Sequence, residues 1–285
     1  MTPRITSFDD YLATYRHSVE DPEGFWGAMA HRFSWRKKWD NVLSWDFKNL
    51  DVKWFEGGKL NITENALDRH LSSRGDQTAL IWEPNDPNED NITYTYKELH
   101  AEVCKMANAL VAQGAKKGDR ICFYMPMVPE LAIAVLACAR IGAIHSVVFA
   151  GFSATALADR INDASCNMVI CSDGNYRGNK QIPVKKVVDE ALHHCSSVEK
   201  VIVKKRTGEE VEWVDGRDVW MHEALEGVST AHEAEEMESE DMLFVLYTSG
   251  STGKPKGVVH TCGGYMIYTE YSFRNVFQYQ NGDVY

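Results

Sequence analysis

The chain has 285 residues, of which 44% are hydrophobic and 25% charged, a composition typical of globular proteins. Its formal net charge of −11 argues against a general binder of nucleic acid or anionic membranes, because both would repel it. No apolar run approaches the length of a membrane span, and the first residues lack the apolar core of a signal peptide.

Residues 1–60 are rich in aromatic side chains and show no regular period. We expect an irregular N-terminal extension that packs through its rings. The rings are Phe25, Trp26, Phe33, Trp35, Trp39, Trp45, Phe47, Trp54 and Phe55.

From residue 92 onward the pattern changes to alternating helices and strands. A capping box at 95–98 opens a helix that runs to Gly114. Continuous apolar runs predict buried strands, and the segments between them have helical periods. The alternation predicts an α/β fold with a doubly wound, mostly parallel sheet, whose ligands bind beyond the carboxyl ends of the strands. Strands are expected at 121–125, 144–149, 168–171 and 200–203, and helices at 129–139, 155–164 and 184–194.

Seven cysteines, an odd number without a CxxC pair, stand at 104, 122, 138, 166, 171, 195 and 262. Several lie in apolar runs, so they are interpreted as buried, reduced thiols of a cytoplasmic protein rather than a disulfide framework or zinc site. His193, His194 and Cys195 are adjacent on a predicted helix and point in different directions, which favours helix packing over metal binding. The acidic segment 206–241 is interpreted as a solvated helix face or connector.

Two loops have residues suited to binding anions. The loop "DGNYRGNK" (173–180) directly follows an expected strand and contains glycines and two cations, although a solvated loop fits these residues as well. The stretch "YTSGSTGKPKGV" (247–258) combines glycines, hydroxyls and two lysines after the apolar run 243–246, which suits a polyphosphate. It is not a Walker A loop, because Thr248 replaces the first glycine and Pro255 replaces the magnesium-binding Ser or Thr. A solvated turn is the alternative.

The stretch "LYTSGSTGKPKGV" resembles the signature loop of the AMP-forming, adenylate-forming enzyme superfamily. Within it the chain is similar to the acetyl-CoA synthetase (acetate–CoA ligase) family, in "WFEGGKLNITENALDRH" (54–70), "GAIHSVVFAGFSATALADRI" (142–161) and "DGNYRGNK". Ala66 stands where cysteine is common in that family. The resemblance covers residue 21 to the last residue.

The resemblance implies a ligase that joins acetate and CoA through acetyl-AMP, using ATP and Mg²⁺. It implies an N-terminal extension at 1–60 and the first part of the large AMP-binding domain at 61–285. The implied ATP phosphate-binding residues are Thr248, Ser249, Gly250, Ser251, Thr252, Gly253, Lys254, Lys256 and Gly257, with Lys256 the family's constant lysine. The implied CoA-binding residues are Arg177, Gly178, Asn179 and Lys180.

Members of this family are more than twice as long as this chain. We expect the acyl pocket, the adenine- and ribose-binding segments, the metal ligand, the catalytic lysine and any regulatory site of lysine acylation to lie beyond Tyr285. Residues 1–285 alone are therefore expected to make no acetyl-CoA. Two alternatives stay open: a ligase for propionate or another short-chain acid, and a non-catalytic nucleotide- or CoA-binding or interaction protein.

Overall fold

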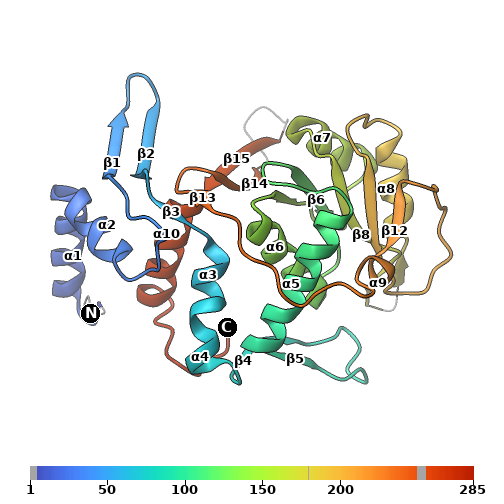
Figure 1. Ribbon diagram of the computed structural model, residues 1–285, viewed down its shortest axis with the longest axis horizontal. Coiled ribbons are helices and arrows are strands. Elements are labelled where there is room, and N and C mark those ends of the chain that lie inside the picture. Colours follow the sequence, from blue (N-terminus) through green and yellow to red (C-terminus); the bar gives the residue numbers. More distant parts are fainter. Residues whose placement is uncertain (1–4, 179, 249–254) are drawn as a thin grey trace. The chain divides into compact units, whose positions relative to one another are not determined.

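The computed structural model describes residues 5–178, 180–248 and 255–285 (Figure 1). The chain divides into two compact units. Unit 1 combines residues 1–65, 236–241 and 260–285, and unit 2 combines residues 66–235 and 242–259.

Unit 2 is built on a seven-stranded sheet in the order β12-β11-β8-β6-β7-β14-β15. From β12 to β14 each neighbouring pair is parallel. The predicted parallel α/β sheet is therefore confirmed. Its strands are β6 (Arg120–Tyr124), β7 (Ile144–Val147), β8 (Met168–Ser172), β11 (Lys200–Lys204), β12 (Asp218–Trp220), β14 (Met242–Thr248) and β15 (Lys256–Thr261).

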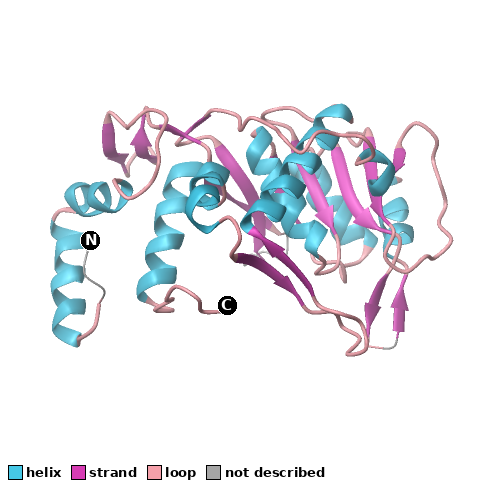
Figure 2. Ribbon diagram, turned by 60° about the horizontal axis from the view of Figure 1, so that its bottom comes forward, coloured by secondary structure: helices cyan, strands magenta, loops and turns pink. Residues whose placement is uncertain are grey.

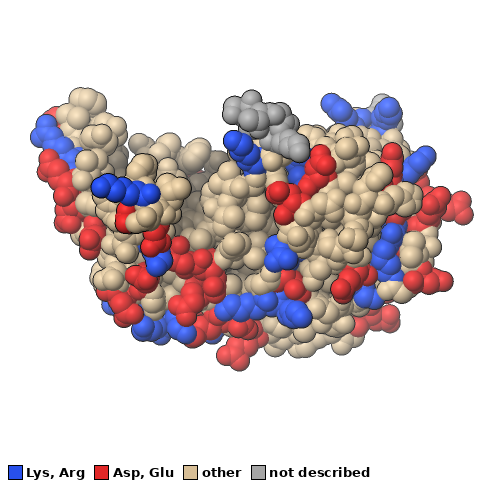
Figure 3. Space-filling model, turned by 90° about the horizontal axis from the view of Figure 1, so that it is seen from above, with Lys and Arg blue, Asp and Glu red and all other residues tan. Residues whose placement is uncertain are grey.

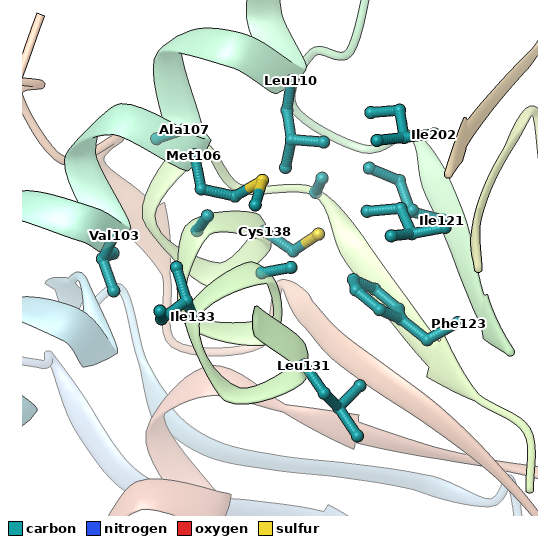
Figure 4. Packing of buried hydrophobic residues seen from close by; sticks show 14 of the residues in the cluster. Val103, Met106, Ala107, Leu110, Ile121, Phe123, Leu131, Ile133, Cys138 and Ile202 are labelled. Atoms are coloured by element: carbon teal, nitrogen blue, oxygen red, sulfur yellow. The ribbon is translucent and has the colours of Figure 1, made fainter. Parts of the chain in front are cut away.

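Helices cover both faces of this sheet (Figure 2). Side chains alternate along a strand, so in β6 Ile121 and Phe123 enter one core cluster, and Cys122 and Tyr124 the other. Figure 4 shows the first cluster, in which Cys138 of α6 points toward Ile121 and Phe123 of β6. The second lies beneath α7 and α8. The helices of unit 2 are α4 (Leu71–Arg74), α5 (Tyr96–Ala112), α6 (Pro129–Ile141), α7 (Ala154–Ala164), α8 (Val184–Leu192) and α9 (Met221–Ala224), with the 3₁₀ turn η1 (Asp68–His70).

Local signals set most of the element ends. Thr95 and Glu98 form the predicted capping box of α5, each side chain binding the other's backbone N–H. Strand β7 ends at Val147 rather than at the predicted residue 149, because the chain leaves the sheet there and the Phe149 side chain is 70% exposed. The acidic segment 206–241 is mostly a connector, as predicted, and contributes the short edge strand β12. Unit 2 also contains the antiparallel pair β4 (Thr78–Trp82) and β5 (Ile92–Thr95).

Unit 1 corrects the prediction of an irregular N-terminal segment. The described residues up to 56 form two helices and a hairpin. The helices form there because Ser7 and Asp21 accept hydrogen bonds at the helix starts and Pro22 begins the second helix. The predicted packing of rings is confirmed, since Trp26 contacts Trp54 and Tyr271 edge to face. Its elements are α1 (Phe8–Glu20), α2 (Pro22–Ala30), β1 (Asn41–Asp46), β2 (Asp51–Glu56), β3 (Lys59–Leu60), β13 (Met237–Glu238) and α10 (Cys262–Asn275), and α3 (Ile62–Ala66) spans its boundary.

All seven cysteines are free thiols, six of them buried and Cys195 half-buried, as predicted. None of the helices in the described ranges is long and apolar enough to cross a membrane.

Candidate functional site

The two predicted anion-binding loops both start at the carboxyl edge of the parallel sheet. The chain passes from the central strand β6 to β7 on one side and then to β8 on the other. The loops that follow these strands therefore diverge, which creates the switch point where such sheets bind ligands. The predicted CoA loop follows β8, and the predicted phosphate loop follows β14, the neighbour of β7.

The structure describes the two ends of the predicted phosphate loop, which we call its first and second arms. Thr248 is the last residue of β14, and Lys256 and Gly257 begin β15. The predicted residues Ser249, Gly250, Ser251, Thr252, Gly253 and Lys254 lie outside the described residues.

Lys256 is exposed, and no described carboxylate lies within ion-pair distance of its amine. Gly257 lies close to β14: a Cβ there would stand 3.0 Å from Val245 Cγ1 and 3.4 Å from the ring of Tyr247. Glycine at 257 therefore lets the second arm of the loop approach the first.

Tyr247, which precedes the loop, is fixed to α7, although it was not among the predicted phosphate-binding residues. Its hydroxyl donates to Asp163 Oδ2 at 2.7 Å. The Arg160 guanidinium carbon lies 5.5 Å from the centre of the Tyr247 ring and 4.7 Å from that of Phe152. Burial, together with the bond to Asp163, raises the pKa of the Tyr247 hydroxyl, so it stays a donor. The first arm of the loop is therefore anchored by a residue 84 positions earlier in the chain.

The predicted CoA loop forms a short antiparallel hairpin of β9 (Asn175–Arg177) and β10 (Lys180–Ile182), seen at the lower right of Figure 2. Arg177 and Lys180 face each other across the two strands, and both are exposed. Gly178 has φ of 57°, the left-handed region that favours glycine. Asn179 lies outside the described residues.

The Arg177–Lys180 pair has an unfavourable charge arrangement. Like charges directly opposite in an antiparallel pair repel each other. Neither side chain forms an ion pair with any carboxylate in the described ranges, whereas nearby Arg206 pairs with Glu89. An anion bound between the two cations would relieve the repulsion, so the hairpin suits a phosphate group.

Asp173 holds the base of the hairpin, a role the sequence did not indicate. Its fully buried carboxylate accepts hydrogen bonds from four backbone N–H groups, those of Gly174, Arg206, Thr207 and Gly208, at 2.7–3.2 Å. The loop after β11 is thereby tied to the carboxyl end of β8. The acceptor and three of its donors are more than 30 residues apart, so no local pattern could reveal the bond.

Two other clusters of charged side chains in unit 2 link helices and strands that pack against each other. Lys185, fully buried, donates to Asp189 at 2.7 Å and to Asp218 at 2.9 Å. Asp68 accepts two hydrogen bonds from Arg140, at 2.9 and 3.0 Å, and lies 3.4 Å from His100 Nε2. Both clusters join secondary-structure elements, and we assign them to stability.

Figure 3 shows Lys and Arg interspersed with Asp and Glu on the face it presents. Among the described residues on this face the two signs are mixed, whereas a nucleic-acid binder is recognised by a stripe of basic residues.

Comparison with known proteins gives matches along nearly the whole chain. The profile of the family described as AMP-binding enzyme matches residues 67–285, and that described as acetyl-coenzyme A synthetase N-terminus matches residues 11–66. An acetyl-coenzyme A synthetase of Alkalilimnicola ehrlichii is 55% identical over 278 residues, which is 97% of this chain and 43% of the relative. Acetyl-coenzyme A synthetase 2 of Pseudomonas putida is 53% identical over 277 residues, with the same coverage.

A solved structure, that of an acetoacetyl-CoA synthetase from Streptomyces lividans, matches with a TM-score of 0.86 and 28% identity. The match covers 96% of this chain and 41% of that one. The chain thus spans about 43% of the length of the curated relatives that it matches.

Proposed function

We propose a function from one premise: this chain belongs to the family of AMP-binding enzymes, whose profile matches residues 67–285. We propose that it works in an acetate–CoA ligase. Acetate attacks the α-phosphate of ATP, giving acetyl-AMP and pyrophosphate, and the CoA thiol then displaces AMP. Relatives named acetyl-coenzyme A synthetase, 53–55% identical to this chain, support acetate as the substrate.

One observation supports this function most strongly. Exposed cations without carboxylate partners among the described residues occur on both of the predicted anion-binding loops at the carboxyl edge: Lys256 after β14, and Arg177 with Lys180 after β8. Two separate anion sites at one sheet edge suit a reaction with two phosphate-bearing substrates.

The loop between β14 and β15 would bind the phosphates that leave as pyrophosphate. In the first step two anions, a carboxylate and a triphosphate, must approach each other, so charge neutralisation and positioning should dominate catalysis. Lys256 supplies a cation at one arm, and Thr248 a hydroxyl at the other. Tyr247, through Asp163, fixes the arm that ends in Thr248.

ATP enters as its magnesium complex. In the described part of the chain no group of three or more His, Cys, Asp or Glu side chains is placed to hold a metal ion. We therefore assign no magnesium ligand to these residues and derive no step through the ion.

The β9–β10 hairpin would bind the 3′-phosphate of CoA between Arg177 and Lys180. The hairpin follows the carboxyl end of β8, and two strands, β6 and β7, lie between β8 and β14 in the sheet. ATP and CoA would thus be held by different loops. The free cysteines support a cytoplasmic location, where thiols remain reduced.

The test separates the two half-reactions in the active enzyme that contains this chain. Acetate-dependent ATP–pyrophosphate exchange reports the first step, and thioester formation from preformed acetyl-AMP reports the second. Arg177→Ala should raise the KM for CoA about tenfold or more, the effect of losing one charge-assisted phosphate contact, and leave exchange intact.

Dephospho-CoA, which lacks the 3′-phosphate, is the matched probe. It should bind more weakly than CoA to the unchanged enzyme, and Arg177→Ala should make no further difference to it. Impaired exchange with an unchanged KM for CoA would show that the hairpin binds a different ligand. Exchange driven better by propionate than by acetate would reassign the acid.

A further inference from the structure

The guanidinium of Arg206 lies between two aromatic rings at the side of the β9–β10 hairpin. Its central carbon is 5.2 Å from the centre of the Trp82 ring and 5.5 Å from the centre of the Tyr176 ring. Both distances are within the range of cation–π attraction. The Trp82 ring is itself fixed, because its indole N–H donates to the Met127 carbonyl at 2.8 Å. Tyr176, on β9, is thus connected through Arg206 to the end of β4.

The charge of Arg206 is already neutralised. Its two terminal nitrogens bind the two carboxylate oxygens of Glu89 at 3.0 and 3.2 Å, and its side chain is only 16% exposed. This distinguishes it from Arg177 and Lys180, which are exposed and form no ion pair in the described ranges. Arg206 is therefore placed to fix the neighbouring side chains Trp82 and Tyr176, and not to bind a phosphate.

Both ends of Arg206 are held in place. Its backbone N–H donates to Asp173 at 2.7 Å, and its guanidinium is held by Glu89 and Trp82. Among the described residues, the side-chain hydrogen bonds between the hairpin strands or turn and their surroundings are long: Asn85 Nδ2 to the Gly178 carbonyl, and Gln181 Nε2 to Glu209, each 3.4 Å. Beyond Asp173 at the base, the contact of Arg206 with Tyr176 is therefore the side-chain support that the described residues give to β9 itself.

We propose that Arg206 is the positioning residue of the CoA hairpin. By stacking on Tyr176 it fixes β9, and with it the spacing and direction of Arg177, the next residue, and of Lys180, its cross-strand neighbour. The ligand class is the phosphate-bearing nucleotide end of CoA, so this inference rests on the proposed function. Preorganised cations bind a phosphate without first having to be ordered.

The experiment measures the KM for CoA and, separately, acetate-dependent ATP–pyrophosphate exchange in the active enzyme. Arg206→Ala should raise the KM for CoA about tenfold and leave exchange within about twofold. Tyr176→Ala should have the same effect, because it removes the ring on which Arg206 acts. Tyr176→Phe keeps the ring and should keep the KM. The double variant Arg206→Ala/Tyr176→Ala should be no worse than either single variant, since the two side chains act as one unit.

Arg36→Ala is the matched control, because Arg36 also forms a two-pronged pair with a glutamate, Glu64, in unit 1. It should leave the KM for CoA unchanged. If Arg177→Ala raises that KM and Arg206→Ala does not, the inference is overturned and the proposed function stands. If neither does, the CoA site itself is wrong.

A general loss of folding gives a different result. If Arg206→Ala weakens exchange as much as it raises the KM for CoA, the residue is merely structural and the inference is overturned. Where Arg206→Ala fails to fold, Tyr176→Ala decides, because Tyr176 is 39% exposed and its loss is tolerated more easily. A raised KM for CoA supports the inference, and an unchanged one contradicts it.

Discussion

Lys256 illustrates how the position of a common residue supports the specific role proposed for it. Exposed lysines are ordinary on protein surfaces, and Lys116 is another one, next to the amino end of β6. Lys256 differs in that it follows the connection from the carboxyl end of β14 and adjoins Gly257, whose missing Cβ lets the two arms lie close. Both lysines are exposed, so exposure does not distinguish them. They differ because Lys256 belongs to a connection at the carboxyl edge of the sheet and Lys116 to one at the amino edge.

Lys256→Ala should slow acetyl-AMP formation about a hundredfold, by analogy with the loss of one group that stabilises transition-state charge. Thioester formation from preformed acetyl-AMP should change little, because pyrophosphate has left by then. Lys116→Ala is the control and should leave both rates unchanged. Equal losses in the two half-reactions for Lys256→Ala would contradict its assignment to the leaving phosphates.

His100 is a residue whose charge state should affect stability. Its hydrogen bond to Asp68, aided by Cys104, raises the pKa of the imidazole to about 9. Burial raises the pKa of the Asp68 carboxyl, but its bonds to His100 and Arg140 outweigh this and hold the pKa well below its usual range. Burial and Arg140 lower the pKa of His232, so His232 stays neutral where His100 titrates.

The free energy of unfolding should therefore decline with rising pH. A histidine whose folded pKa is raised stabilises fully below its unfolded value of 6.5 and loses this contribution as the pH rises through about 9. We expect a loss of about 1–3 kcal/mol across this window. The neighbouring Cys104 thiol, whose pKa is lowered overall, has the opposite effect at the upper end and reduces the decline.

Urea unfolding of His100→Gln, measured from pH 6 to pH 9, is the test, with the exposed His194→Gln as control. The decline should disappear in the first variant and persist in the second. A decline of the same size in His100→Gln would exclude His100 as its source.

At the scale of elements, a buried ion cluster fastens α8 to the edge strand β12. Lys185 and Asp189 lie on α8, and Asp218 begins β12. Burial raises the pKa of Asp218, but Arg217 and Lys185 outweigh it and the net shift is downward. Four groups, two of each sign, thus hold together a three-residue strand that the hydrophobic pattern did not reveal.

Lys185→Met should lower the free energy of unfolding by about 3 kcal/mol or more, because the buried Asp218 and the half-buried Asp189 would keep their ion pairs with Arg217 but lose those with the buried lysine. Urea denaturation followed by tryptophan fluorescence measures the change. Lys186→Met, at the exposed neighbouring position, should stay within about 0.5 kcal/mol of the unchanged protein. Two variants of equal stability would show that Lys185 is not needed to balance the cluster.

At the scale of the whole molecule, the alternating strands and helices of unit 2 could be predicted because their signals are local. Capping at Thr95 and the apolar runs depend on neighbouring residues only. Helices α1 and α2 were missed although Ser7 and Asp21 cap them, since the aromatic content of the segment obscured their period.

In the candidate site, too, some residues could be predicted from the sequence and others could not. The residues proposed to bind phosphate and CoA form contiguous motifs, so the sequence alone was enough to propose them. Their supports could not be proposed in this way, because Tyr247 meets Asp163 across 84 positions and Arg206 meets Asp173 across 33. Such pairs come together only once the order of strands is known.

The distribution of free thiols has a practical consequence. Cys262 is buried in unit 1, and five buried cysteines are spread through unit 2. A thiol reagent in excess should label each of them only when the surrounding structure opens, so labelling rates resolved by mass spectrometry would report local opening in each unit separately. Cys195 is half-buried and would therefore react first, so its labelling rate serves as the internal reference for the others. The chain thus contains its own set of reporters, with no probe to introduce, for asking whether ATP or CoA stabilises either unit.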